Sequence, residues 1–428
     1  MQRKHTELVR ALTLLDATSI GFGAIIGAGI FVILGVATSL AGPGVLLSVI
    51  IAGAVSLFTA FSFSALSSEI PKEGGPYEYA YEVFSPFIGF LTGWMLTFGQ
   101  IVMGATVAIG LATYLALFLP LSIKLVAAGA CLVFTLLNLV GVKESATVNN
   151  GLVAFKVLVL LFFIAVGVSY IQTSNFQPFL PNGFSGVVSG AAIIFFAYLG
   201  FGRVAAISEE VKNPEKNIPL SIMLALGISF IIYLLVSLTA VGISGYGRLA
   251  ASGSPLADAM GITGNNLAKF VVSLGAIVAT ASVLITTIMG VSRIPFAMAR
   301  NRQAPESITR IHPGFGTPYI SVLLIGLLMT ALVFMGDLKQ VASVASVSII
   351  SVHVLVNYAA IVVSKKGAKY KIPFYPLTPL LGIASCAALT LSLLPETWVV
   401  ESVVLLAGIA FYLIIRARDK DNVKIENR

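Results

Sequence analysis

Long stretches without a charged side chain divide this sequence and restrict the environments in which it can fold. Nine such stretches cover most of the chain: 17–68, 83–123, 125–142, 157–202, 217–247, 270–292, 311–336, 340–364 and 372–395. About 20 apolar residues are enough for a helix to cross the hydrocarbon core of a bilayer. Only 10% of the residues are charged and 57% are hydrophobic, whereas a soluble domain carries about 25% charged residues. The pattern predicts an all-α integral membrane protein, because helices satisfy their own backbone hydrogen bonds in lipid.

The longest stretches exceed one crossing, and turn-forming residues inside them show where each is divided. The segment after residue 40 reads AGPG, and the segment after residue 171 reads QTSNFQPFLPNG. Division at such points predicts twelve spans, near 14–40, 44–68, 86–119, 125–141, 148–171, 186–208, 219–243, 267–292, 317–335, 340–363, 374–394 and 397–415. The first apolar run is too long for a signal peptide. We expect a single transmembrane domain over residues 1–428, without a separate soluble domain.

Lysine and arginine are distributed unequally between alternate loops. With the N-terminus in the cytoplasm, 20 of these 26 residues lie in cytoplasmic segments and four in external loops, and the other two, Lys156 and Arg203, lie in spans. This bias follows the positive-inside rule and predicts cytoplasmic termini in a multi-pass protein of the cell membrane. The net charge of +8 is then explained by inner loops that face anionic lipid in the bilayer, and no nucleic-acid partner is expected.

Glycines crowd into the first span, where residues 21–31 read GFGAIIGAGIF. Each glycine destabilises a helix interior by about 1 kcal/mol relative to alanine, so their concentration needs a reason. A dinucleotide-binding loop is excluded, because its spacing and its strand are missing. Two explanations stay open. One is close helix packing through Gly23 and Gly27; the other is a helix interrupted at mid-membrane, which exposes backbone groups to a ligand.

A second glycine pair favours the interruption. Residues 190–202 read GAAIIFFAYLGFG, which places Gly200 and Gly202 within the sixth span. Transporters built from inverted repeats interrupt corresponding helices of their two halves, and the first and sixth spans correspond when each repeat has five. The sequence therefore predicts a five-plus-five inverted repeat, with repeat one near 14–171, repeat two near 186–363 and two additional helices near 374–415. Exposed backbone at both interruptions predicts a binding site between them.

Four motifs carry a resemblance to a known family. They are GFGAIIGAGIF at 21–31, EIPKEGGPYEYA at 69–80, FFAYLGFG at 195–202 running into EEVKNPEKNIP at 209–219, and SRIPFAMARNRQAP at 292–305. From about residue 10 to 415 the chain resembles the amino acid–polyamine–organocation superfamily of secondary transporters, and within it the prokaryotic amino acid transporters. The resemblance implies the five-plus-five fold with helices one and six broken, and an amino acid as the substrate.

The two interruptions offer complementary charges to an α-amino acid. The N–H groups of Ala28 and Gly29 begin the outer half of the first helix and suit the carboxylate, because a helix N-terminus carries partial positive charge. Carbonyl groups suit the ammonium, namely those of Phe196, Ala197 and Leu199 in the sixth span and that of Ile25 in the first. Gly27 and Gly29 allow the ligand to approach the backbone closely. The resemblance implies the same assignment at these positions.

The predicted pocket lacks acidic side chains. The third and eighth spans contain no acidic residue. Gly99 or Gln100 occupies the place where some members of the family that the chain resembles carry a glutamate. A pocket for lysine, arginine or a polyamine needs a buried carboxylate as the partner of the buried cation. Neutral amino acids are therefore the expected substrates. An amino acid exchanger and a carrier of polyamines or cationic amino acids remain the alternatives.

One lysine lies inside an apolar span. Lys156 stands six to ten residues into the fifth span, roughly 9–15 Å from its cytoplasmic end. Snorkelling toward the interface is one explanation, and a functional ionisable group is the other. The resemblance implies the second, because several proton-coupled relatives carry a lysine here, where sodium-coupled members bind Na⁺. The ammonium would then meet the Gly23 carbonyl and the Ser282 hydroxyl, and burial would make its proton exchangeable. Proton coupling without sodium, metal or cofactor is expected.

Other chemistries lack the residues that they need. The three histidines have no metal-ligand spacing, and no pair of acids occurs within the spans, so an enzyme is not expected. No filter motif of a channel is recognisable. We expect His353 to be a packed side chain rather than a proton relay, and Arg203 to pair with Glu209 or Glu210 near the cytoplasmic mouth. The oligomeric state is left open.

Overall fold

The computed structural model describes residues 11–70, 72, 74–141, 146–206, 211–393 and 395–426. The first helices are α1 (Leu14–Ile25), α2 (Leu34–Ala41), α3 (Val45–Glu69), α4 (Pro76–Val83), α5 (Pro86–Leu115) and α6 (Ile123–Val140). They are followed by α7 (Ala146–Gly167), α8 (Gly183–Tyr198), α9 (Gly202–Ala206), α10 (Pro214–Ser244), α11 (Tyr246–Ala251) and α12 (Pro255–Ile262). The last are α13 (Asn266–Arg300), α14 (Tyr319–Leu332), α15 (Leu338–Lys365), α16 (Leu377–Leu391) and α17 (Pro395–Glu426). The described residues form no sheet, and one isolated bridge joins Leu12 to Val211.

Nine helical segments of this described part are long and apolar enough to cross a membrane. The first runs through α1, α2 and α3 from Leu14 to Glu69, 56 residues in all, and two further apolar helices, α14 and α16, are shorter. The all-α membrane architecture predicted from the sequence is thereby confirmed. The count of twelve spans, the inverted repeat and the single domain over the whole chain stay predictions.

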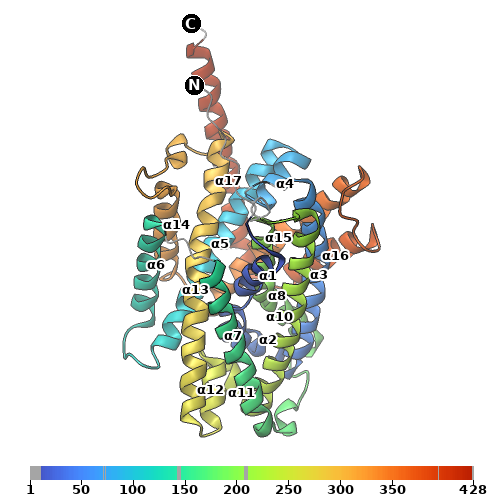
Figure 1. The fold of residues 1–428 in the computed structure, drawn as a ribbon, viewed down its shortest axis with the longest axis vertical. Coiled ribbons are helices and arrows are strands. Elements are labelled where there is room, and N and C mark those ends of the chain that lie inside the picture. Colours follow the sequence, from blue (N-terminus) through green and yellow to red (C-terminus); the bar gives the residue numbers. More distant parts are fainter. Residues whose placement is uncertain are drawn as a thin grey trace.

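The glycine-rich helices lie in the interior of the bundle (Figure 1). Helix α8 packs against α2 and α3, and α1 packs against α10 and α7. Helix α5 contacts both α13 and α15, and α6 lies with α14 at the periphery. The short helices α11 and α12 lie at one end of the molecule, whereas α4 and the projecting end of α17 lie at the other. The interior position means that any interruption in α1 or α8 is enclosed by protein, as the hydrogen-bonding needs of the backbone demand.

Both glycine-rich spans are interrupted, but to different degrees. Helix α1 ends at Ile25, Ile26 is extended (φ −74°, ψ 100°), and the chain resumes as a wide π-helical turn over Gly29–Ile33 that leads into α2. Helix α8 ends at Tyr198 and passes through a 3₁₀ turn, Leu199–Phe201, into α9. The residues that flank this turn keep right-handed helical angles. The first interruption is therefore a break in the helical conformation, and the second is a tightening of the helix.

The two interruptions pack backbone against backbone, and glycine makes this contact possible. A Cβ atom on Gly29 would lie 2.4 Å from the Cα atom of Ala197, and one on Gly200 would lie 2.3 Å from the carbonyl carbon of Ala24. Neither neighbour is a side chain that can rotate away. Any residue larger than glycine at these two positions would push α1 and α8 apart.

Two further glycines of the first span face neighbouring helices. A Cβ atom on Gly23 would lie 2.5 Å from Val153 of α7, and one on Gly27 would lie 2.4 Å from Val283 of α13. Close packing through this pair is the first of the two explanations that the sequence leaves open. The structure contains both, because the same run of glycines that interrupts the helix also allows α7 and α13 to approach it.

We expect Gly200→Ala to destabilise the protein, because the new methyl group would meet the backbone of α1. Overpacking of this kind costs on the order of 1–3 kcal/mol, so the thermal midpoint of the detergent-purified protein should fall. Gly227→Ala in α10 is the matched control, because nothing lies within 4 Å of a Cβ atom at that position. Its midpoint should be unchanged or higher. A Gly200→Ala protein that melts with the wild type would contradict the contact.

Candidate functional site

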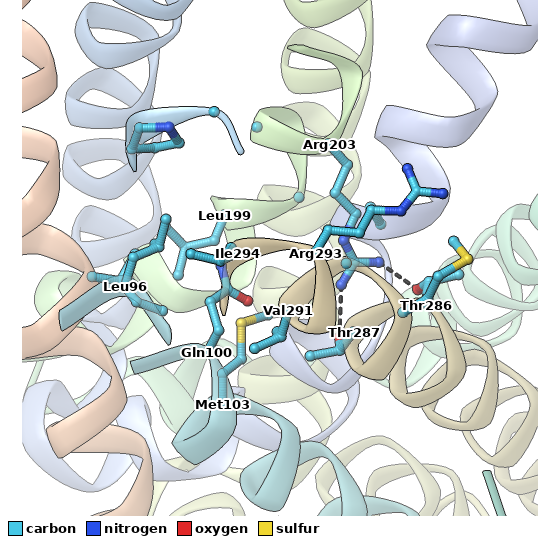
Figure 2. A pocket seen from close by; sticks show the side chains of 18 of the residues that line it. Leu96, Gln100, Met103, Leu199, Arg203, Thr286, Thr287, Val291, Arg293 and Ile294 are labelled. Carbon is cyan, nitrogen blue, oxygen red and sulfur yellow. Dashed lines mark hydrogen bonds between the residues drawn. The ribbon is translucent and has the colours of Figure 1, made fainter. Parts of the chain in front are cut away.

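A cavity of about 200 Å³ lies beside the two interruptions (Figure 2). Its wall comes from α1, α3, α5, α7, α13 and α15, from α9 and the turn before it, and from the segment that leads into α4. Gly23 of α1 and Gly200 of the turn both border it. Since a single water needs about 10–15 Å³ of such volume, the cavity has room for more than one water molecule. This size suits a small metabolite, because pockets for drug-sized ligands begin at about 300 Å³.

Among the residues predicted to bind the substrate, Leu199 lines this cavity and the others are buried outside its wall. The others are Ile25, Gly27, Ala28, Gly29, Phe196 and Ala197. The structure brings the two predicted half-sites together, but Gly29 lies directly against Ala197, so that no space for a ligand separates them. Substrate binding by these residues stays a prediction.

Two tyrosines that sequence reasoning missed hold carbonyl groups near the first interruption. The Tyr233 hydroxyl of α10 lies 2.7 Å from the carbonyl oxygen of Ile25 and 3.2 Å from that of Ala197. The Tyr114 hydroxyl of α5 donates to the carbonyl oxygen of Phe31 at 2.6 Å. A hydroxyl has one hydrogen to donate, so Tyr233 serves one of its two carbonyls at a time. A buried tyrosine needs a polar partner, but the sequence has 13 tyrosines and does not indicate which of them face the interruptions.

Lys156 points into the bundle from α7, with 1% of its surface exposed. Its Nζ donates to the carbonyl oxygen of Gly23 in α1 at 3.1 Å and to the hydroxyl of Ser282 in α13. Both partners predicted for this ammonium therefore contact it, and the side chain joins three helices at one point. A snorkelling lysine would instead extend toward the membrane interface. The role of this cluster in proton coupling stays a prediction.

Arg203 reaches the cavity from α9 and donates hydrogen bonds to two hydroxyl groups of α13 (Figure 2). Its Nη2 lies 2.7 Å from Oγ1 of Thr287, and its Nη1 contacts Oγ1 of Thr286. The partners predicted from the sequence, Glu209 and Glu210, lie outside the described residues. The sequence does not indicate that these two threonines contact Arg203. Threonine is common in apolar helices, and the direction in which each one points depends on the packing of α9 against α13.

The remaining polar lining of the cavity is cationic or neutral. Arg293 and Gln100 contribute to it, and no acidic side chain does among the residues that the structure describes. His353 borders the cavity from α15, and its Nδ1 lies 2.6 Å from the carbonyl oxygen of Ile349. Its ring packs among three phenylalanines, Phe63, Phe195 and Phe201, with centroid distances of 5.5, 5.6 and 6.1 Å. His353 is thus held by aromatic packing and one backbone contact.

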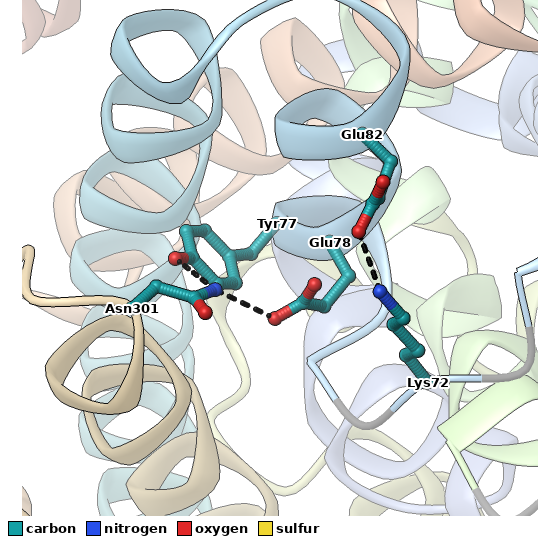
Figure 3. Close-up of polar contacts among 5 residues, drawn as sticks. All are labelled: Lys72, Tyr77, Glu78, Glu82 and Asn301. Atoms are coloured by element: carbon teal, nitrogen blue, oxygen red, sulfur yellow. Dashed lines mark hydrogen bonds and ion pairs between the residues drawn. The ribbon is translucent and has the colours of Figure 1, made fainter.

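A polar cluster holds α4 beside the cavity (Figure 3). Asn301, which follows α13, donates through Nδ2 to the Tyr77 hydroxyl at 2.8 Å and to Glu78 Oε1 at 3.1 Å. The Tyr77 hydroxyl in turn donates to Gln303 Oε1 at 3.0 Å. Residues 74–76, directly before this cluster, line the cavity. Burial raises the pKa of the Glu78 carboxyl above its ordinary 4.5, because the charged form loses its hydration there.

These observations define the class of protein. An all-α membrane bundle in which two interrupted helices meet beside a cavity of metabolite size has the architecture of a membrane transporter. A family model described as amino acid permease matches residues 12–414. The chain belongs to this amino acid permease family, within the amino acid–polyamine–organocation superfamily that its motifs resemble.

Several characterised relatives match this chain over most of its length. It is 33% identical to the methylthioribose transporter of Bacillus subtilis (strain 168), over 96% of this chain and 95% of the relative. It is 34% identical to the branched-chain amino acid permease BcaP of the same organism, over 95% and 93%. The cationic amino acid transporter 4 of the Arabidopsis thaliana vacuole is 33% identical over 80% of this chain and 61% of the relative. These are transporters and not enzymes, and the family implies an amino acid as the small-molecule substrate.

We expect the α4 cluster to weaken as the pH rises. A raised pKa in the folded state means that folding favours protonated Glu78, so this stabilisation is complete below pH 4.5 and is lost as the pH passes through the raised value. Glu78→Gln keeps an oxygen for Asn301 and carries no charge. Hydrogen exchange in α4, corrected for its intrinsic pH dependence, should therefore accelerate with pH in the wild type and stay constant in Glu78→Gln.

The control for this experiment is Glu306→Gln, which neutralises an exposed glutamate in the segment after α13. It should keep the pH dependence of the wild type in α4. The interpretation of Glu78 is wrong when Glu78→Gln and the wild type show the same change with pH.

Proposed function

We propose that this protein is a secondary active transporter of neutral amino acids in the cell membrane, coupled to protons and independent of sodium. The observation that carries the proposal is Lys156, whose buried ammonium joins α7 to Gly23 of α1 and Ser282 of α13, two residues that line the cavity. It supplies an ionisable group next to the interrupted helix. An ionisable side chain buried in a membrane-spanning helix is a functional group by default, because it is costly to keep there.

The charges of the cavity support neutral amino acids over the other substrates of the relatives. Those relatives are named as transporters of methylthioribose, of branched-chain amino acids and of cationic amino acids, so family membership alone does not select among these substrates. Arg203 and Arg293 line the cavity, and no described acid accompanies them there. A cationic side chain would meet like charges in a site of low dielectric constant. The α-carboxylate that every amino acid carries is attracted by the same arginines.

Backbone groups recognise the zwitterion in this proposal. The carboxylate binds the N–H groups of Ala28 and Gly29, beside Gly27, and the ammonium binds the carbonyl groups of Ile25, Phe196, Ala197 and Leu199. In the present structure Tyr233 donates to this set of carbonyls and Gly29 touches Ala197. Binding therefore requires the two interrupted segments to separate and Tyr233 to release a carbonyl. The structure then corresponds to a state in which this backbone site is closed.

The cavity belongs to the cytoplasmic side of the transporter. Residues 74–76 of the segment before α4 line it, and α4 lies at the end of the molecule from which α17 projects (Figure 1). The loops on that side hold most of the lysines and arginines when both termini are cytoplasmic. In this proposal Leu14–Glu69 crosses the membrane twice, and the shorter helices α14 and α16 cross it as well. The spans then number twelve, arranged as two inverted repeats and two added helices.

Coupling acts through the charge of Lys156. The charged ammonium holds α7 to Gly23 of α1 and Ser282 of α13, whereas the neutral amine has one hydrogen fewer to donate. A conformational equilibrium shifts only by the difference in interaction free energy between its states. A tenfold difference in proton affinity between the two orientations of the carrier supplies about 1.4 kcal/mol. A proton that binds in one orientation and leaves in the other thereby drives uptake.

We expect Lys156→Ala to lose the pH dependence of transport. In proteoliposomes, wild-type uptake of labelled L-leucine should rise as the external pH falls, persist without sodium and collapse with a protonophore. The variant should still bind the substrate but transport it at a rate that ignores pH, because no ionisable group then links α7 to α1 and α13. Lys124→Ala, which removes an exposed lysine outside the cavity, is the control and should behave as the wild type. Wild-type uptake that requires Na⁺ and ignores pH would refute the coupling.

We expect neutral amino acids to compete more strongly than cationic ones. Unlabelled alanine, leucine and valine should reduce L-leucine uptake at concentrations at least about tenfold below those of lysine, arginine or putrescine, the tenfold ratio corresponding to about 1.4 kcal/mol of like-charge repulsion. Methylthioribose in the same assay separates the amino acid proposal from a sugar-like substrate. The assignment would be contradicted if lysine or putrescine reduced L-leucine uptake at lower concentrations than alanine, leucine and valine do.

A further inference from the structure

Arg203 is a charged group of the cavity to which the proposed backbone site assigns no role. It projects from α9 shortly after the second interruption, and its guanidinium is held between two threonines of α13 (Figure 2). A guanidinium has five N–H donors. Thr286 and Thr287 engage two of its nitrogens, and the side chain also borders the cavity. Arg203 is therefore placed to donate further hydrogen bonds to a ligand.

The two threonines fix the direction in which Arg203 points. The Thr286 hydroxyl lies 3.0 Å from the carbonyl oxygen of Ser282, and the Thr287 hydroxyl lies 2.6 Å from that of Val283. Each hydroxyl hydrogen is thus directed at the backbone of α13, which leaves the hydroxyl oxygens to accept from Arg203. The guanidinium is oriented before any ligand arrives, and an oriented donor loses little conformational freedom on binding.

Among the described residues, the printed hydrogen-bond partners of Arg203 are the neutral hydroxyl groups of Thr286 and Thr287. No acid in the described ranges forms an ion pair with it, and none of the described residues that line the cavity is acidic. A buried charge is stabilised by a partner of opposite sign. A carboxylate matches the planar fork of a guanidinium, because its two oxygens accept two parallel hydrogen bonds.

We propose that Arg203, supported by Thr286 and Thr287, is a second carboxylate-binding site, which holds the α-carboxylate of the amino acid in the cavity after it leaves the backbone site. The identity of the ligand rests on the proposed function, whereas binding of a carboxylate does not. The cavity of about 200 Å³ has an apolar wall that includes Leu96, Met103 and Val291. A neutral side chain packs against this wall while the carboxylate faces Arg203.

Acetate is the probe, because it carries the carboxylate without the ammonium. Saturation-transfer NMR on the detergent-purified full-length protein should detect acetate binding, and acetamide, which has the same shape without charge, should bind at least about tenfold more weakly. Arg203→Gln should weaken acetate binding by at least about tenfold. The acetate affinity of Arg203→Lys should lie between those of the wild type and Arg203→Gln, because an ammonium keeps the charge but lacks the planar fork. Thermal midpoints establish that the variants are folded.

Arg248→Gln is the matched control, because this arginine of α11 borders a different cavity at the other end of the molecule. It should leave acetate binding unchanged. Equal acetate affinity in the wild type and Arg203→Gln, or equal binding of acetamide and acetate, would overturn the site. L-leucine should displace acetate from the wild type. Acetate binding that depends on Arg203, in a protein that neither transports nor binds amino acids, would overturn the proposed function and leave the carboxylate site standing.

Discussion

The contact between the backbones of the two interrupted spans is the constraint on which the rest of the structure depends. Gly29 meets Ala197, and Gly200 meets Ala24, at distances that exclude any Cβ atom. Inside a membrane, a backbone group that leaves its helix needs another partner, because no water is present to replace it. Here the Tyr233 hydroxyl of α10 supplies such a partner, because it lies within hydrogen-bond distance of a carbonyl oxygen in each of the two segments. The glycines that permit the close contact and the tyrosine that donates to the carbonyl groups both serve this requirement.

One turn of α13 connects the groups to which we assign function. Ser282 accepts from Lys156, Thr286 and Thr287 accept from Arg203, and the Thr286 hydroxyl donates to the Ser282 carbonyl within the same turn. The turn therefore contacts α7 and α9, and through Val283 it also packs against Gly27 of the first interruption. A small movement of α13 changes the surroundings of the lysine and the arginine together. If α13 has two arrangements, this turn is where the two proposed sites would be coupled.

The sequence predicts the membrane architecture and part of the site, and physical reasons explain the division. The charge-free stretches predict the all-α class, because few other structures can place such long apolar stretches in a membrane. The contacts of Lys156 with Gly23 and Ser282 follow from the family resemblance. The degree of each interruption did not follow, since Gly200 produces a 3₁₀ turn whereas the run around Gly27 produces an extended residue. The tyrosine and threonine partners were missed, because their roles depend on which neighbouring helix each one faces.

The charges of the cavity and of the interruption beside it give a reason for the zwitterionic ligand that we propose. Arg203 and Arg293 place positive charge along the wall, and carbonyl groups such as those of Ile25 and Ala197 place negative partial charge at the interruption behind it. A zwitterion carries no net charge, so it enters a site of low dielectric constant at less cost than an ion does. In the backbone site that we propose, its carboxylate would meet N–H groups and its ammonium would meet carbonyl groups. A site with one sign of charge would favour ions, whereas the site that we propose, with both signs in different places, would favour a molecule that carries both.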